Sequence, residues 1–198
     1  NGRSYGDSAL SISNTISMKY FNHMLDFNND TGELVLESGV LLADVISTFL
    51  PLGWFPSVTP GTKFVTIGGM IAADVHGKNH HKHGSFGNFV NWIELIDSDG
   101  NIIKCSKLEN SEQFDWTIGG MGLTGIVIRV AFSLLKVDTG WVRQTTIPSK
   151  NLKSTIDIIE KSMNATYSVA WIDCMHKNHQ LGRSIVMSTD RLSGFIND

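Results

Sequence analysis

The sequence predicts an α+β fold on a mostly β scaffold. Residues 92–105 carry the signature of a two-stranded hairpin, and residues 126–132 are rich in β-branched side chains. Helical spacing of apolar residues is confined to short stretches such as 41–50. The chain has 198 residues, of which 41% are hydrophobic, so it can bury a sizeable core in one domain or in one domain and part of a second.

The first ninety residues predict few regular elements. Residues 1–18 combine a glycine-rich turn with alternating Leu10, Ile12 and Ile16, which indicates a loop and then a strand. We next expect a turn, a strand and a helix that stops at Pro51, at residues 28–32, 33–39 and 41–50. The stretch 51–91 is rich in glycine and aromatics, and its periodicity is too weak to predict an element.

The next elements are clearer. Two strands, 92–96 and 102–105, flank the turn Ser98-Asp99-Gly100, which predicts a hairpin. A short helix and a strand follow, at 110–117 and 126–132.

The pattern changes near residue 137, where we place a domain boundary between 1–136 and 137–198. Beyond it the sequence predicts a strand, a helix and two more strands, at 141–147, 149–163, 167–174 and 181–189. In the helix, Leu152, Ile156 and Ile159 lie on one face. One helix and three strands seldom close a core alone, so we expect the second unit to be incomplete.

Composition excludes several classes of protein. The net charge is −3, with 16 basic and 19 acidic residues, which lacks the basic excess of nucleic-acid-binding proteins. No apolar run reaches about 18 residues, so no membrane-spanning helix is predicted. Cys105 and Cys174 lie in apolar surroundings and are expected to be buried free thiols. The chain opens on Asn1 without an initiator Met, so we expect the natural N-terminus to lie upstream.

Two glycine motifs resemble catalytic signatures but lie in the wrong context. Gly120–Gly125 spells G-x-G-x-x-G, which binds dinucleotides when a strand precedes it and a helix follows; here the predicted order is reversed. It remains either a tight turn or a turn whose backbone touches a cofactor. Gly2–Gly6 spells G-x-S-x-G, the serine-hydrolase elbow, yet Ser8–Ser17 is not helical and no clear Asp and His partners follow.

A third feature places four histidines between His76 and His83. Three interpretations stay open: a zinc site, a solvated polar loop, and a loop that binds an anion or cofactor. No Asp, Glu or Cys is interleaved, which weakens the metal interpretation. Small residues let the backbone approach a phosphate, and Lys78 and Lys82 add positive charge.

Together the glycine segments resemble a known family. The matching strings are Gly2–Asp7, Pro60–Lys63, Val65–Gly69, Ala73–His81, Gly84–Asn88, Gly122–Ile126, Ala170–Asp173 and Leu181–Arg183. They resemble the vanillyl-alcohol-oxidase-type (PCMH-type) FAD-linked oxidoreductases, and within them the decaprenylphosphoryl-β-D-ribose 2′-oxidase family. The resemblance covers nearly the whole chain, and the string from Ala73 to Asn88 is its most specific part.

The resemblance implies a bipartite FAD-binding domain, with a small α+β lobe and a larger β-rich lobe, followed by a truncated α+β substrate domain. It implies cofactor contacts at Gly2, Arg3, Ser4, Tyr5, Gly6, Asp7, Gly61, Thr66, Ile67, Gly68, Gly69, Ala73, Asp74, Val75, His76 and Ile126. Residues near the reactive face of the flavin would be His76, Lys78 and Tyr5. Many relatives attach the flavin to a histidine in the first glycine turn; here that turn holds Ser4-Tyr5, so non-covalent FAD is expected.

The implied reaction oxidises a secondary hydroxyl of a sugar or a polyprenyl-phospho-pentose, a cell-wall arabinan precursor, by hydride transfer to flavin N5. His76 is expected either to position the substrate or act as a base, or only to contact FAD, and Lys78 either to bind a substrate phosphate or to be solvated. The family's catalytic lysine is expected beyond Asp198. The alternatives are an alditol or aldonolactone oxidase that uses oxygen, and a non-catalytic flavin-binding module. A short-chain reductase partner and a cytoplasmic or membrane-peripheral location are expected.

Overall fold

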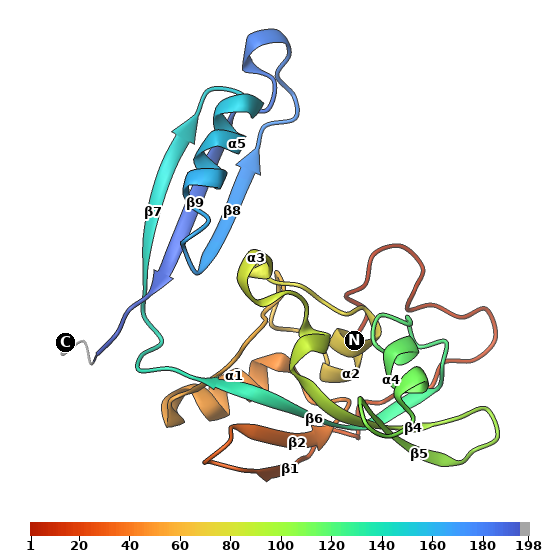
Figure 1. The fold of residues 1–198 in the computed structure, drawn as a ribbon. Coiled ribbons are helices and arrows are strands. Elements are labelled where there is room, and N and C mark those ends of the chain that lie inside the picture. Colours follow the sequence, from red (N-terminus) through yellow and green to blue (C-terminus); the bar gives the residue numbers. More distant parts are fainter. Residues whose placement is uncertain (195–198) are drawn as a thin grey trace. The chain divides into compact units, whose positions relative to one another are not determined.

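The computed structural model describes residues 1–194 and divides the chain into two compact units (Figure 1). The first unit comprises Asn1–Gly77 and His83–Lys136, and the second comprises Lys78–Lys82 and the chain from Val137 onward. The predicted α+β class is confirmed, and the sheets of the described residues are antiparallel. No helix within the described residues is both long enough and apolar enough to span a membrane.

The first unit is built on an antiparallel sheet that, among the described residues, has six strands. Its strands are β1 (Met24–Phe27), β2 (Glu33–Glu37), β3 (Trp54–Pro56), β4 (Val90–Ile96), β5 (Ile102–Ser106) and β6 (Ile126–Lys136). The order is β1-β2-β6-β4-β5, and β3 also pairs with β6. The long strand β6 therefore pairs with three others and organises the sheet.

Helices pack on one face of this sheet. The helices are α1 (Leu42–Phe49), η1 (Leu50–Leu52), α2 (Ile67–Ala72), η2 (Phe86–Phe89) and α4 (Ser111–Thr117), while α3 (His80–His83) straddles the two units. Strand β2 alternates as a half-buried strand should, with Leu34 and Leu36 fully buried. These side chains join Phe132 and Phe86, whose rings meet edge to face with centroids 5.2 Å apart, in one continuous apolar core.

Most elements predicted for the first unit are confirmed, but one is wrong. The hairpin, both predicted helices and the strands at β2 and β6 are present. Residues 1–17 form no strand and are exposed throughout, including Leu10 and Ile12. Alternation alone cannot make a strand where no neighbouring strand pairs with it and no surface covers its apolar face.

The second unit is a three-stranded antiparallel sheet with one helix on it (Figure 1). Its elements are β7 (Val142–Ser149), α5 (Leu152–Lys161), β8 (Tyr167–Ile172), η3 (Asn178–Gln180) and β9 (Ser184–Arg191), with β9 in the middle. Asn151 caps α5 by accepting from the Ser154 N–H at 3.0 Å, while Ser154 Oγ accepts from the Asn151 N–H at 3.2 Å. Each predicted element of this unit is found.

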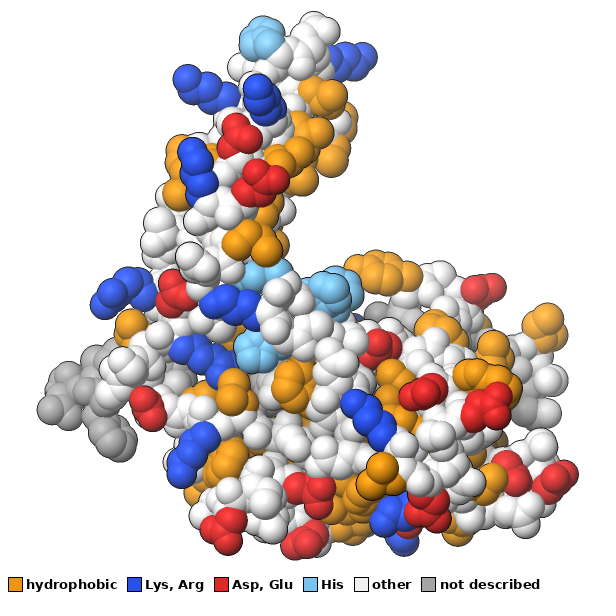
Figure 2. Space-filling model, in the orientation of Figure 1, with side chains coloured by type: hydrophobic (Ala, Val, Ile, Leu, Met, Phe, Trp, Pro, Cys, Tyr) orange, Lys and Arg blue, Asp and Glu red, His pale blue; other side chains and the backbone are white. Residues whose placement is uncertain are grey.

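The side chains of the second unit are less buried than the sequence suggests. Leu152 and Ile156 of α5 are 45% and 47% exposed, whereas Thr155 is buried. Figure 2 shows hydrophobic side chains on the surface of this unit among Lys and Arg side chains. The expected burial of both cysteines is half wrong: Cys105 is buried in the first unit, but Cys174, in the loop after β8, is exposed.

Candidate functional site

A cleft in the first unit lies between the N-terminal segment and α2. Its volume is about 230 Å³. It is lined by Asn1, Gly2, Arg3, Ser4, Ser8, Ala9, Val65, Thr66, Gly69, Ala72, Ala73, Val75 and Met121. Parts of all three glycine-rich segments of the sequence therefore meet at one place.

Helix α2 forms the floor of the cleft, and its start is fixed by side-chain and backbone partners. Thr66 caps the helix by accepting from the Gly69 N–H at 3.2 Å. The Gly68 N–H donates to Ser38 O at 2.8 Å, and a Cβ at Gly68 would lie 2.9 Å from Ser38 Cβ. The N–H groups of Gly68 and Gly69 therefore already have protein partners and are not free donors for a ligand. A ligand at the start of α2 would instead contact the Gly69 backbone and the Thr66 hydroxyl.

The turn at 119–125 reaches the cleft by docking on the end of α2. The N–H groups of Gly119 and Met121 donate to Ile71 O and Ala72 O, at 2.9 and 2.8 Å. Gly119 has φ +76°, a conformation that favours glycine. This docking brings Met121 to the cleft, so the G-x-G-x-x-G string is a turn between α4 and β6 that contributes one side chain to the site.

The N-terminal segment forms the opposite wall and is anchored at both ends. Asn1 Nδ2 donates to Phe64 O at 2.6 Å, next to the cleft. Further along, the Gly39 N–H donates to Phe21 O at 2.7 Å, and a Cβ at Gly39 would lie 2.6 Å from that oxygen. A side chain at Gly39 would displace the segment that leads to the cleft.

The carboxylate of Glu37 adds to the anchor between Gly39 and Phe21. Glu37 Oε2 accepts from the His23 N–H at 2.9 Å and lies 2.7 Å from His23 Nδ1. The backbone hydrogen bond from His23 is the main reason that the pKa of Glu37 lies below its usual value.

The structure brings together some of the residues predicted to bind the cofactor and not others. Those on the cleft are Gly2, Arg3, Ser4, Thr66, Gly69, Ala73 and Val75. Those outside its lining are Tyr5, Gly6, Asp7, Gly61, Ile67, Gly68, Asp74, His76 and Ile126. Lining residues that sequence reasoning missed are Asn1, Ser8, Ala9, Val65, Ala72 and Met121. Each lies within two residues of a glycine or of another predicted contact, so extending the motifs along the chain would have found them.

Several residues outside the lining have structural roles that the geometry explains. Ile67 is fully buried in the core. Asp74 adopts φ +38°, and its Oδ1 accepts from the Gly87 N–H at 2.8 Å, which fixes the loop before β4. Gly61 is different, because a Cβ there would meet nothing within 4 Å.

The three residues expected near the reactive face lie outside the lining of the cleft. Tyr5 is 97% exposed. His76 is exposed and forms a β-bridge with Ser85 in the first unit. Lys78 belongs to the second unit, where its carbonyl accepts from the Ser168 N–H at 2.9 Å.

The chemistry of the cleft fits part of an anionic dinucleotide. Arg3 is its one charged side chain among the described lining residues, and hydroxyls come from Ser4, Ser8 and Thr66. Its described lining includes no carboxylate, so none of these side chains would repel a pyrophosphate. Val65, Val75 and Met121 supply apolar surface. Its volume is below the roughly 300–1,000 Å³ of complete ligand pockets, so it would hold one portion of an extended ligand.

The metal interpretation of the histidine segment gains no support. Within residues 1–194, no three or more His, Cys, Asp or Glu side chains lie close enough to hold a metal ion.

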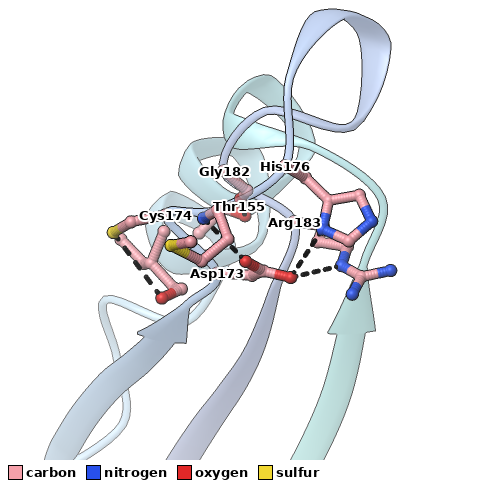
Figure 3. A network of polar contacts seen from close by, with 8 residues as sticks. Thr155, Asp173, Cys174, His176, Gly182 and Arg183 are labelled. Atoms are coloured by element: carbon pink, nitrogen blue, oxygen red, sulfur yellow. Dashed lines mark hydrogen bonds and ion pairs between the residues drawn. The ribbon is translucent and has the colours of Figure 1, made fainter.

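A separate polar cluster lies on the loop between β8 and β9 (Figure 3). Asp173 Oδ1 accepts from the Met175 N–H at 2.9 Å, and Oδ2 accepts from Arg183 Nε at 2.8 Å and lies 2.9 Å from His176 Nδ1. These hydrogen bonds, with the Met175 N–H first, lower the pKa of Asp173 to about 2. The cluster fixes the loop and is remote in sequence from the cleft residues.

Comparison with known proteins agrees with the geometry of the cleft. The model of a family described as "FAD binding domain" matches residues 1–106, more than half of the chain and nearly all of the cleft lining. The chain is 35% identical over 189 residues to decaprenylphosphoryl-beta-D-ribose oxidase of Mycolicibacterium smegmatis, covering 93% of this chain and 41% of that protein.

More distant relatives have other substrates in their names. Bovine L-gulonolactone oxidase is 28% identical over 162 residues, 82% of this chain and 36% of that protein. D-lactate dehydrogenase of Anaerostipes hadrus is 23% identical over 184 residues, 90% and 37% of the two chains. The chain spans about two-fifths of the length of these curated relatives.

Proposed function

The chain belongs to the FAD-binding domain family, and on this premise we propose that it is part of an FAD-linked oxidoreductase that acts on CH–OH groups. FAD is the cofactor of the family. In this proposal residues 1–136 form a bipartite FAD-binding domain, with a small α+β lobe and a larger β-rich lobe, and residues 137–198 begin the substrate domain.

The observation that carries the proposal is the convergence of three glycine-rich segments on one cleft whose described lining holds no carboxylate. Arg3 would hold the pyrophosphate as a hydrogen-bonding cation, and the exposed backbone at Gly69 would let the ligand lie against α2. The first glycine turn holds Ser4-Tyr5 where many relatives carry a histidine, which supports a non-covalent flavin.

The proposed chemistry divides between cofactor and protein. When bound, FAD supplies a hydride acceptor at N5 for the carbon of a secondary alcohol. His76, exposed beside the cleft residue Val75, would orient the hydroxyl or take its proton, because a neutral imidazole carries both a donor and an acceptor nitrogen. Tyr5 would lie at the reactive face, and Lys78 would bind an anionic group of the substrate.

For the substrate we propose a sugar with a secondary hydroxyl, and in particular a polyprenyl-phospho-pentose. The likeness to decaprenylphosphoryl-beta-D-ribose oxidase supports this choice, and Lys78 offers a cation for the phosphate. The ketone product would suit a short-chain reductase partner, and a lipid-linked substrate would suit peripheral contact with a membrane.

The test uses the full-length protein. We expect a yellow preparation whose flavin is released by acid, and anaerobic addition of a short-chain prenyl-phospho-pentose should bleach the flavin absorbance. Arg3→Met should weaken FAD binding, while the matched change at an exposed arginine of the second unit, Arg143→Met, should not. A colourless preparation that takes up no FAD on reconstitution would refute the proposal.

A second candidate is a sugar-lactone or alditol oxidase that uses oxygen. The likeness to bovine L-gulonolactone oxidase supports it. Rapid reoxidation of the reduced flavin in air, together with turnover of an aldonolactone, would favour this candidate over the phospho-pentose oxidase.

A further inference from the structure

The histidine segment, predicted from its sequence as one loop, is divided between the two units. His76 and His83 lie in the first unit, but Lys78–Lys82 packs within the second. The chain thus leaves the first unit after Gly77 and returns to it at His83.

Three hydrogen bonds hold Lys78–Lys82 in the second unit. The Ser168 N–H donates to Lys78 O at 2.9 Å. His81 Nε2 lies 2.9 Å from Ala165 O, so its N–H tautomer donates to that carbonyl. Lys82 Nζ donates to Asn164 O. Asn79, between these contacts, is fully buried.

The carbonyls of Asn164 and Ala165 lie in the turn that leads to β8, just beyond Lys161, where α5 ends. Both carbonyls lie past the cap residue Ser162, and the side chains of His81 and Lys82 supply donors for them. Both ends of the segment are therefore fixed: Lys78 through its backbone on β8, and His81 and Lys82 through their side chains on the turn before it.

We propose that His81 and Lys82 are positioning residues, which fix the backbone of Lys78 on the second unit so that its ammonium binds the phosphate of the substrate. This inference rests on the proposed function. It places two neighbouring candidate residues in different units, with His76 in the first and Lys78 in the second.

The test compares two double variants of the FAD-loaded full-length protein. His81→Phe with Lys82→Met keeps the bulk of both side chains but removes both donors. The matched control, His179→Phe with Lys153→Met, makes the same chemical changes at exposed positions of the second unit. Backbone hydrogen exchange at Ser168 and at 78–82, FAD content, and KM and kcat for a short-chain prenyl-phospho-pentose are measured.

We expect the first double variant to exchange about tenfold faster at Ser168 and to raise KM about tenfold, as the loss of about 1.4 kcal/mol of hydrogen bonding would do. FAD content and kcat should stay near those of the parent protein. Lys82→Arg, which keeps a donor for Asn164 O, should behave as the parent does, and so should the control.

Two results would overturn the inference. One is unchanged exchange and unchanged KM in the first double variant. The other is loss of FAD with KM unaltered, which would assign the segment to the cofactor. A parent protein that binds no FAD or oxidises no sugar would instead refute the proposed function, and hydrogen exchange would still show whether His81 and Lys82 hold the segment.

Discussion

The two units bury different kinds of side chain. In the first unit one apolar cluster joins both strands and helices, and residues such as Leu34, Ile93 and Phe132 are fully buried. In the described part of the second unit, Ala165 and Val186 are the buried hydrophobic residues, and a cluster of buried hydroxyls joins α5 to the sheet. Thr155 Oγ1 lies 2.9 Å from Ser149 Oγ and 2.7 Å from Ser184 Oγ.

The difference indicates what each unit depends on. Burial of apolar area stabilises the first unit, so the walls of the cleft rest on a well-packed base. In the second unit the hydroxyls at Thr155 contribute to the contact, and a buried hydroxyl left without a partner is costly. On the sheet face away from α5, the paired residues Trp171 and Ile185 are 70% and 47% exposed, so this unit also presents apolar surface.

The largest effect is expected from a cavity in the first unit. Phe132→Ala removes a fully buried ring that packs on Phe86, and should lower the free energy of unfolding by about 3–5 kcal/mol. Urea unfolding measures the loss, and hydrogen exchange at β6 assigns it to the first unit. Ile102→Ala, at a side chain 65% exposed, is the control and should change stability by less than about 0.5 kcal/mol. Equal losses in the two variants would contradict an apolar core centred on β6.

A smaller effect is expected from the hydroxyl contact of the second unit. Thr155→Val keeps the shape of the side chain but leaves Ser149 and Ser184 short of a partner, which should cost about 1–3 kcal/mol. Thr155→Ser keeps the hydroxyl and should cost less. Hydrogen exchange at the β9 amides measures this loss of stability. If the Thr155→Val variant were as stable as the parent protein, the contrast between the two cores would be wrong.

These contrasts also explain how far the sequence could predict the fold. The hairpin of β4 and β5 was predictable because Asp99-Gly100 specifies its turn locally. Helix α2 was not predicted, because Gly68 and Gly69 are poor helix formers, and tertiary contacts to Ser38 and the cap at Thr66 hold it. The failed strand at 1–17 shows the reverse case, a pattern without a partner.

The candidate site was predictable in its segments but not in its details. Glycine spacing located the three segments, since close approach and positive φ are local requirements that glycine meets. Which residues face the cleft depends on long-range docking, such as Met121 on Ala72, and no local signal reports it. The division of 76–83 between two units also depends on contacts to residues about 85 positions away, such as His81 to Ala165.

The two units further differ in their carboxylates, and the larger acid effect is expected in the second. Hydrogen bonds from the Met175 N–H and Arg183 lower the pKa of Asp173 from 3.8 to about 2. A lowered folded-state pKa gives stability that is present above about pH 4 and is lost as pH falls towards 2. Asp173→Asn should remove this part of the acid dependence and lower the stability at neutral pH. An NMR titration of the Asp173 carboxyl measures its pKa, and an ordinary pKa for Asp173 would contradict the prediction. Asp157→Asn, on α5, is the control variant.

The smallest effect concerns Glu37 in the first unit. Its pKa lies below 4.5, chiefly because the His23 N–H donates to the carboxylate, with the His23 ring as a weaker cause. The stabilisation is therefore present above about pH 4.5 and fades as pH falls below the lowered pKa. Glu37→Gln keeps an oxygen for the N–H but no charge for the ring, so it should slightly lower stability at pH 7 and flatten the acid dependence. Because His23 lies on the segment that leads to the cleft, FAD affinity should fall slightly with it, whereas Glu33→Gln, earlier on the same strand, should leave FAD affinity unchanged. Titrating FAD into each variant compares their affinities for FAD. A fall in FAD affinity in Glu33→Gln alone would mean that the His23–Glu37 pair does not anchor the cleft wall.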